Sequence, residues 1–87
     1  MEPIELPIED TIDLHTFQPR EIPDLLEEYI HQVRLKGYRE VRIIHGRGIG
    51  VQREIVHSFL RKHPHVVAFK DAADRGSTIA ALMQNDA

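Results

Sequence analysis

The segment Ile-Ile-His-Gly-Arg-Gly-Ile-Gly, at residues 43–50, constrains the fold of this chain more than any other part of it. The aliphatic run that leads into it is typical of a buried strand, and the spacing of apolar residues after it is typical of a helix. Glycine at alternate positions permits a tight connection and lets backbone N–H groups approach an anionic ligand. The following helix adds the positive end of its dipole. We therefore interpret the segment as a strand–loop–helix unit suited to anion binding.

The remaining hydrophobic pattern predicts the element order β-α-β-α-β-β. Strands are expected at 12–15, 40–45, 66–70 and 78–83, and helices from Ile22 to a stop at Lys36-Gly37 and from Val51 to Pro64. Strand–helix–strand connections of this length join parallel strands through right-handed crossovers. We expect an α/β fold, a two-layer sandwich in which a mixed, mainly parallel four-stranded sheet carries two helices on one face.

The length of 87 residues indicates one domain. Residues 1–11, which contain two prolines and alternating apolar residues, predict an extended N-terminal arm, and residues 12–87 the domain itself. The absence of cysteine excludes disulfides and thiolate metal sites and fits a reducing compartment. No apolar stretch is long enough to span a membrane, and the N-terminus does not resemble a signal peptide. A cytoplasmic, stand-alone monomer is the expectation.

The formal net charge of −3 argues against a broad, non-specific nucleic-acid binder. The charges are unevenly distributed, however: residues 1–11 carry only acidic ones, and basic residues predominate between Arg34 and Lys62. Most of these basic residues fit ordinary solvated positions. Arg47 and Arg53 differ, because they lie in or just after the glycine loop.

Three side chains are candidates for catalysis because parallel strands present their carboxyl ends at one edge of a sheet, where ligands bind. The first strand ends at His15 and the second at His45, and Asp13 shares one side of its strand with His15. A histidine titrates near neutral pH and can remove a proton from water or a hydroxyl group. A carboxylate can orient that histidine, and loop amides with Arg47 can stabilise charge on a phosphate. This grouping suits phosphodiester cleavage.

Other interpretations of the same residues stay open. An aspartate and a histidine at a strand end are often only hydrogen-bonded. Asp13, His15 and His45 also suit a divalent metal ion, so a metal cofactor is possible, although no second carboxylate joins them. The remaining histidines are interpreted as surface residues: His31, His57, His63 and His65.

The glycine loop does not match the common nucleotide-binding motifs. Its spacing is G-x-G-x-G, whereas dinucleotide sites use G-x-G-x-x-G and P-loops end in Gly-Lys-Ser/Thr. A mononucleotide or NAD site is therefore disfavoured. The glycines also fit a purely structural role in a tight turn with close helix–sheet packing, and that role is compatible with phosphate binding.

Several motifs together resemble the small MutS-related (Smr) domain family. They are Ile-Asp-Leu-His at 12–15, His-Gly-Arg-Gly-Ile-Gly-Val at 45–51, Arg53, and Gly-Ser-Thr at 76–78. In that family a Leu-Asp-Leu-His strand opens the domain, a His-Gly-Lys/Arg-Gly-x-Gly loop follows the second strand, and a Gly-x-Gly-Ala-Thr-like segment precedes the last one. The resemblance covers about residues 12–83, with the motifs in the same order.

The resemblance implies a fold similar to the C-terminal half of bacterial translation initiation factor three. Members bind DNA or RNA, and several are endonucleases that nick or cleave, often at branched structures. By this resemblance Asp13 and His15 are catalytic candidates, and His45 begins the nucleic-acid-facing loop. The candidate nucleic-acid-binding residues are Gly46, Arg47, Gly48, Gly50, Arg53, Gly76 and Thr78.

Two departures from the family pattern concern loop geometry. Thr16 follows His15 where the family usually has glycine, and the segment around Gly76 contains fewer glycines than usual. The first hypothesis is an endonuclease acting on structured DNA or RNA. The second is a non-catalytic DNA- or RNA-binding accessory module in repair, recombination or translation. A third is a protein-interaction domain whose acidic arm contacts a basic partner.

Overall fold

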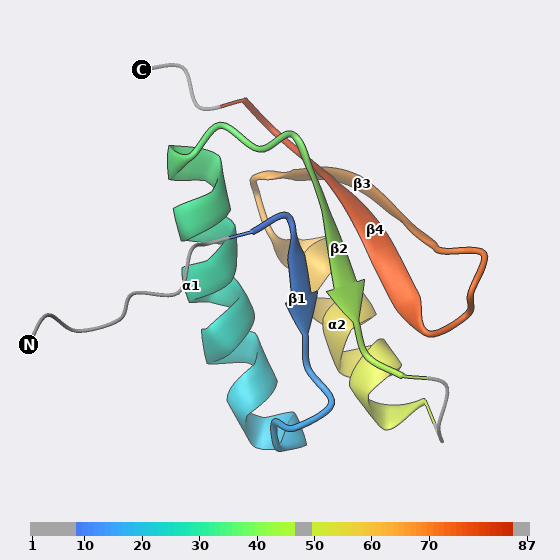
Figure 1. Ribbon diagram of the computed structural model, residues 1–87. Helices are drawn as coiled ribbons and strands as arrows, with labels where there is room; N and C mark the ends of the chain where they lie inside the picture. The colour runs from blue at the N-terminus through green and yellow to red at the C-terminus, as the bar shows by residue number, and fades with distance from the viewer. Residues whose placement is uncertain (1–8, 47–49, 85–87) are drawn as a thin grey trace, which may run out of the picture.

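The computed structural model describes residues 9–46 and 50–84 and contains one four-stranded sheet with two α-helices (Figure 1). The strands are β1 (Thr11–Asp13), β2 (Glu40–Ile44), β3 (Val66–Asp71) and β4 (Ser77–Leu82). The helices are α1 (Ile22–Leu35), preceded by the 3-10 turn η1 (Pro19–Glu21), and α2 (Val51–Lys62). The predicted α/β class and element order are confirmed. Within the described residues, no helix is long and apolar enough to cross a membrane.

The sheet order is β1-β2-β4-β3, which corrects the expectation of a mainly parallel sheet. Only β1 and β2 pair in parallel, whereas β4 pairs antiparallel with both β2 and β3. The two strands joined through α2 run in the same direction but are not neighbours, because β4 lies between them. The short connection from β3 to β4 makes an antiparallel hairpin, and the small side chains of β4 suit a central strand.

Both helices pack on the same face of the sheet, as expected for two right-handed crossovers that proceed in the same direction. The core lies between them and the strands; its buried members are Leu14, Ile22, Leu26, Tyr29, Ile30, Val33, Val41, Ile43, Val56, Leu60, Ala80 and Leu82. The other face of the sheet has no helical cover in Figure 1. Because side chains alternate along a strand, each strand contributes residues to the core and to this open face.

The predicted stop of α1 is confirmed, and its geometry shows why the chain turns there. Gly37 has a φ of 84°, a left-handed conformation that glycine adopts without steric cost. The N–H of Tyr38 donates to the carbonyl of Val33 at 3.0 Å, which closes the helix end and directs the chain into β2. Val51 was expected on the apolar face of α2, but 49% of this residue is exposed.

Candidate functional site

The candidate catalytic residues lie at the edge of the sheet where β1 and β2 end. Asp13 is in register with Ile44, and the N–H of Leu14 donates to the carbonyl of Ile44 at 2.8 Å. The parallel pairing therefore brings the ends of the two strands side by side, as the sequence predicts.

Asp13 and His15 form a close pair on this edge. Asp13 Oδ1 lies 2.7 Å from His15 Nδ1 and also accepts a hydrogen bond of 3.0 Å from the backbone N–H of His15. These hydrogen bonds, first that from the backbone, hold the pKa of Asp13 below its ordinary value. The pair is open to solvent, with 68% of the His15 side chain and 46% of the Asp13 side chain exposed. The carboxylate thus stays ionised and fixes one ring nitrogen of an accessible imidazole.

His45 is directed to the other side of the sheet. It continues the alternation of Val41 and Ile43, so its ring lies on the helix-facing side, and only 5% of the residue is exposed. His45 Nε2 lies 2.9 Å from the hydroxyl of Thr78, and His45 Nδ1 lies 3.1 Å from the carbonyl of Gly46. Among the described residues, no hydrogen bond, ion pair or ring contact joins His45 to Asp13 or His15. The three side chains were expected to converge. They instead form two groups, with His45 apart from Asp13 and His15.

His45 belongs to a group that sequence reasoning missed. His57 Nε2 also lies 2.9 Å from the Thr78 hydroxyl and 3.4 Å from Asp71 Oδ1, and the rings of His57 and His45 meet edge to face at 6.2 Å. Asp71 forms a two-point ion pair with Arg53, with Nε–Oδ1 and Nη2–Oδ2 distances of 3.0 and 2.6 Å. We call these five residues, His45, Arg53, His57, Asp71 and Thr78, the histidine network.

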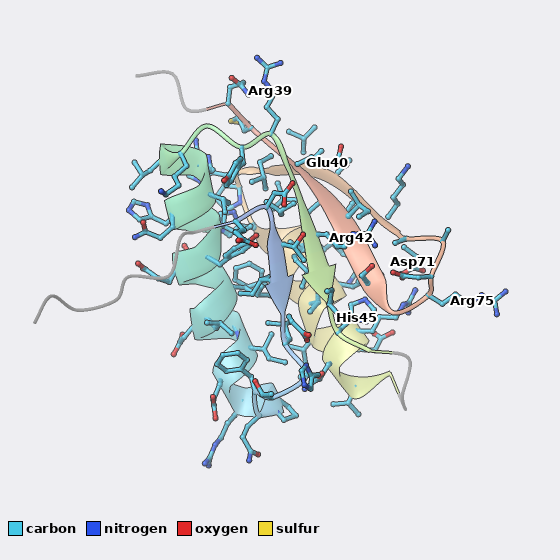
Figure 2. The ribbon with its side chains drawn as sticks, in the orientation of Figure 1. Arg39, Glu40, Arg42, His45, Asp71 and Arg75 are labelled. Carbon is cyan, nitrogen blue, oxygen red and sulfur yellow. The ribbon has the colours of Figure 1, made fainter. Side chains whose placement is uncertain are left out.

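The histidine network occupies the polar end of the core. Asp71 continues the helix-facing alternation after Phe69, and Thr78 precedes Ala80 on the same face; Asp71 and Thr78 are partners in the sheet register. Since β2 and β3 end at this edge and β4 begins there, the strands bring His45, Asp71 and Thr78 together. Helix α2 adds His57 and Arg53. Figure 2 shows His45 and Asp71 near the ends of their strands.

Ionisation within the histidine network follows from these contacts. Burial lowers the pKa of His57, and the positive charge of Arg53 lowers it further. The hydrogen bonds from Arg53 lower the pKa of Asp71, and that carboxylate in turn raises the pKa of Arg53. Near neutral pH the network therefore combines an anionic carboxylate, a cationic guanidinium and a His57 ring that favours its neutral form.

The glycines at the two ends of the loop have the conformations that the tight connection requires. Gly46 has a φ of 87°, and Gly50, which precedes the first residue of α2, has a φ of 83°. A pocket of about 330 Å³ lies beside them and is lined by Pro19, His45, Gly46, Gly50, Val51, Gln52 and Arg53. It adjoins the N-terminus of α2, where backbone N–H groups have no partner within the helix. Arg47 and Gly48, two of the predicted ligand contacts, lie outside the described residues.

The β3–β4 loop supports the start of the glycine loop. The carbonyl of Gly76 accepts hydrogen bonds from the N–H groups of His45 and Gly46, at 3.0 and 2.9 Å. Asp74 accepts from the N–H of Gly76 at 2.9 Å, and Arg42 donates to Asp74 at 3.0 Å. Gly76 therefore positions the candidate loop through its backbone. Arg75 has a φ of 62° and extends from the loop tip, away from the sheet (Figure 2).

Thr78 and Arg53 differ from the expectation of direct nucleic-acid contact. Thr78 is fully buried, so a ligand cannot reach it. Its hydroxyl is hydrogen-bonded to the imidazoles of His45 and His57 instead. Arg53 lines the pocket, but its guanidinium is engaged by Asp71.

The interpretation of four histidines as surface residues was correct only for the exposed His31. The side chains of His57 and His63 are 12% and 6% exposed, because His57 packs beneath the sheet edge and His63 lies against Glu27 at 3.1 Å. His65 is partly buried beside Arg34. The departure at Thr16 introduces no left-handed backbone, since Arg75 is the only described non-glycine residue with a positive φ.

Known proteins share the sequence and the fold of this chain. A model of the Smr domain matches residues 12–83. The chain belongs to the Smr domain family. The sequence resemblance stated above is thereby confirmed over almost the whole chain.

Curated relatives carry this Smr domain as a small part of longer proteins. The chain is 41% identical over 61 residues to Endonuclease MutS2 of Helicobacter pylori and 34% identical over 79 residues to that of Halothermothrix orenii. These matches cover 70% and 86% of the chain but only 8% and 10% of the relatives.

Solved Smr structures share the fold. The Smr domain of Thermus thermophilus MutS2 superposes with a TM-score of 0.79 at 28% identity, covering 83% of this chain and 95% of that one. YdaL, a stand-alone small MutS-related protein from Escherichia coli, gives a TM-score of 0.81 at 25% identity, covering 86% of this chain and 65% of that one.

Proposed function

We propose that this Smr domain binds structured DNA or RNA at the edge formed by the ends of β1 and β2, and that it cleaves a phosphodiester bond there. The observation that carries the proposal is the Asp13–His15 pair, in which a carboxylate holds one nitrogen of a solvent-accessible imidazole at 2.7 Å. Membership of a family that includes regions of proteins named Endonuclease MutS2 supports the same activity.

The chemistry follows from the arrangement of the pair. With its Nδ1–H donated to Asp13, His15 is held in the tautomer whose Nε2 carries a lone pair. That nitrogen takes a proton from the attacking water or ribose hydroxyl, and the new imidazolium is stabilised by the Asp13 carboxylate. The deprotonated oxygen forms a new bond to phosphorus while the bond from phosphorus to the leaving oxygen breaks on the opposite side, and the leaving oxygen takes a proton from solvent.

Phosphate binding is assigned to the glycine loop. The pocket beside Gly46 and Gly50 adjoins the N-terminus of α2, where unpaired N–H groups and the helix dipole attract an anion. Arg47, in the middle of the loop, supplies the positive charge. His45 positions the start of the loop through its contact with the Gly46 carbonyl and so takes a supporting role.

A second candidate is a non-catalytic nucleic-acid-binding module in repair, recombination or translation. Two observations favour it: the ring of His45 faces the core and not the Asp13–His15 pair, and the guanidinium of Arg53 is paired with Asp71. This module would use the same loop and pocket without bond cleavage.

The test is cleavage of end-labelled branched DNA and structured RNA by the purified chain, with and without chelator. We expect Asp13→Ala and His15→Ala to abolish cleavage while binding persists. The matched control is His31→Ala, an exposed histidine on α1 away from the sheet edge. Cleavage that survives both substitutions contradicts the catalytic assignment, and binding without cleavage by the unaltered chain establishes the second candidate.

The loop assignment is tested separately by the salt dependence of binding. If Arg47 contacts one phosphate, Arg47→Ala reduces the slope of log K against log salt by about 0.7–0.9. Lys36→Ala, at the far end of α1, controls for general loss of positive charge. Equal changes in both variants, or none, would argue against a phosphate contact in the loop.

A further inference from the structure

We propose that the histidine network is a site for a zinc-class divalent metal ion, with His45 Nε2, His57 Nε2 and one carboxylate oxygen of Asp71 as ligands. These residues differ from the Asp13–His15 pair, and the proposal does not depend on whether the chain cleaves nucleic acid. It concerns the polar end of the core, where three donor atoms from three elements lie together.

One pair of donor atoms already has the spacing that a tetrahedral ion needs, and the third donor lies nearby. All three lie within 4.8 Å of one another, and His57 Nε2 and Asp71 Oδ1 are 3.4 Å apart. Bond lengths of about 2.0–2.2 Å place neighbouring ligands of tetrahedral zinc roughly 3.3–3.6 Å apart. The His57–Asp71 pair is therefore already at that separation, and the longer distances in the cluster must shorten when a metal binds.

His45 already has the orientation of a metal-bound histidine. Its Nδ1 lies 3.1 Å from the carbonyl of Gly46, so Nδ1 carries the proton and Nε2 presents a lone pair toward His57 and Thr78. Metal-ligating histidines commonly donate their second N–H to a backbone carbonyl in this way. The Asp71 carboxylate is likewise oriented by a second partner, Arg53.

The donor set also selects the class of ion. Two imidazole nitrogens and one carboxylate oxygen suit Zn²⁺ and Co²⁺, whereas Mg²⁺ and Ca²⁺ require mainly oxygen ligands. Three protein ligands leave a fourth position for water. Histidine binds metal in its neutral form. The positive charge of the Arg53 guanidinium repels a cation and so weakens metal binding. Its hydrogen bonds go to Asp71 and not to the donor atoms of the histidines.

Without metal, the Thr78 hydroxyl joins the two proposed histidine ligands through hydrogen bonds. The Thr78 hydroxyl donates to His45 Nε2 and accepts from His57 Nε2–H, each at 2.9 Å. Metal binding would replace these two bonds by coordination, and the proton of the neutral His57 ring would move from Nε2 to Nδ1, because metal binds the unprotonated nitrogen. A purely structural network predicts the same distances but no selective response to metal, and this difference provides the test.

The experiment titrates the chelator-treated full chain with Co²⁺ and Zn²⁺, with Mg²⁺ as the contrasting ion. We expect one Co²⁺ per chain with the intense visible absorption of a four-coordinate ion, displaced by Zn²⁺. At zinc about 100-fold above its Kd, Tm should rise by roughly 11–22 °C. His57→Ala and Asp71→Asn should each weaken binding by about 100-fold or more. If His57→Ala does not fold, His57→Gln, whose amide can still bond Thr78, takes its place.

His31→Ala is the control for adventitious binding, and His63→Ala tests the histidines near Glu27. Unchanged affinity in both control variants, with loss in the His57 and Asp71 variants, supports the site. Failure to bind Co²⁺ or Zn²⁺ overturns it. So does unchanged affinity in a folded His57 variant, or loss of binding caused by His63→Ala.

Discussion

The Asp13–His15 pair and the histidine network lie at the same edge of the sheet but are built in opposite ways. The pair joins two residues of one strand end, separated by two positions, and remains open to solvent. The network joins β2, β3, β4 and α2, and its central threonine is fully buried. An exposed pair depends little on the rest of the fold, whereas a buried network must be satisfied completely. We therefore expect substitutions in the pair to affect activity and substitutions in the network to affect stability.

The largest expected difference in stability is between His45→Ala and His15→Ala. Removing the buried His45 ring leaves a cavity and removes a partner of Thr78, which should cost about 2–4 kcal/mol. His15→Ala removes an exposed ring and should change the free energy of unfolding by less than about 0.5 kcal/mol. Urea unfolding of both variants measures the contrast. Equal losses would mean that the two groups are not energetically distinct.

Thr78→Val isolates the hydroxyl at the centre of the network. Valine preserves the shape of the side chain but leaves two buried imidazole nitrogens without their shared partner. The expected cost is about 1–3 kcal/mol in the free energy of unfolding. Thr11→Val, on exposed β1, is the matched control and should be nearly neutral. A neutral Thr78→Val would show that the imidazoles find other partners.

The Arg53–Asp71 ion pair should contribute less than the Thr78 hydroxyl. Although it has two-point geometry, the side chains are 38% and 45% exposed, so water and salt screen the attraction. A double-mutant cycle with Arg53→Ala and Asp71→Ala measures the coupling in the free energy of unfolding. The coupling should be positive and should fall as salt is raised. A salt-independent coupling would indicate that the pair is more shielded than its exposure implies.

The smallest effect should come from Asp13→Asn, and it should depend on pH. The pKa of Asp13 is lowered in the folded chain, so ionised Asp13 stabilises the fold above the ordinary pKa of 3.8. This contribution is lost as the pH falls through the lowered folded pKa. The stability difference from Asp13→Asn should therefore be present at pH 7, remain well under about 1 kcal/mol because of exposure, and vanish in strong acid. Urea unfolding across this range measures it, and a difference that grows in acid would have the wrong sign.

Local pattern was enough to predict much of this protein. The spacing of apolar residues predicted both helices, and Lys36-Gly37 and Pro64 predicted where they stop. The structure adds that Gly37 and Gly50 have left-handed backbone. The proximity of Asp13 and His15 was also predicted, from the shared side of residues two apart in a strand. In the structure β1 ends at Asp13, and His15 lies in the following turn, where its backbone N–H donates to Asp13 Oδ1. The separation of His45 from the Asp13–His15 pair can also be partly traced to the sequence. His45 follows Val41 and Ile43 at intervals of two, and Asp71 follows Phe69 in the same way, which places both on the core side.

What the sequence determined by itself was therefore local: element types, their ends, the membership of an α/β family and the pairing of Asp13 with His15. Only the tertiary structure decided that β4 enters between β2 and β3. That insertion brings Thr78 between His45 and His57 and places Asp71 beside them. The physical reason is that neighbouring residues have few possible relative positions, whereas contacts between distant residues depend on how all strands pair and which face each one buries. The histidine network depends on all of these choices at once.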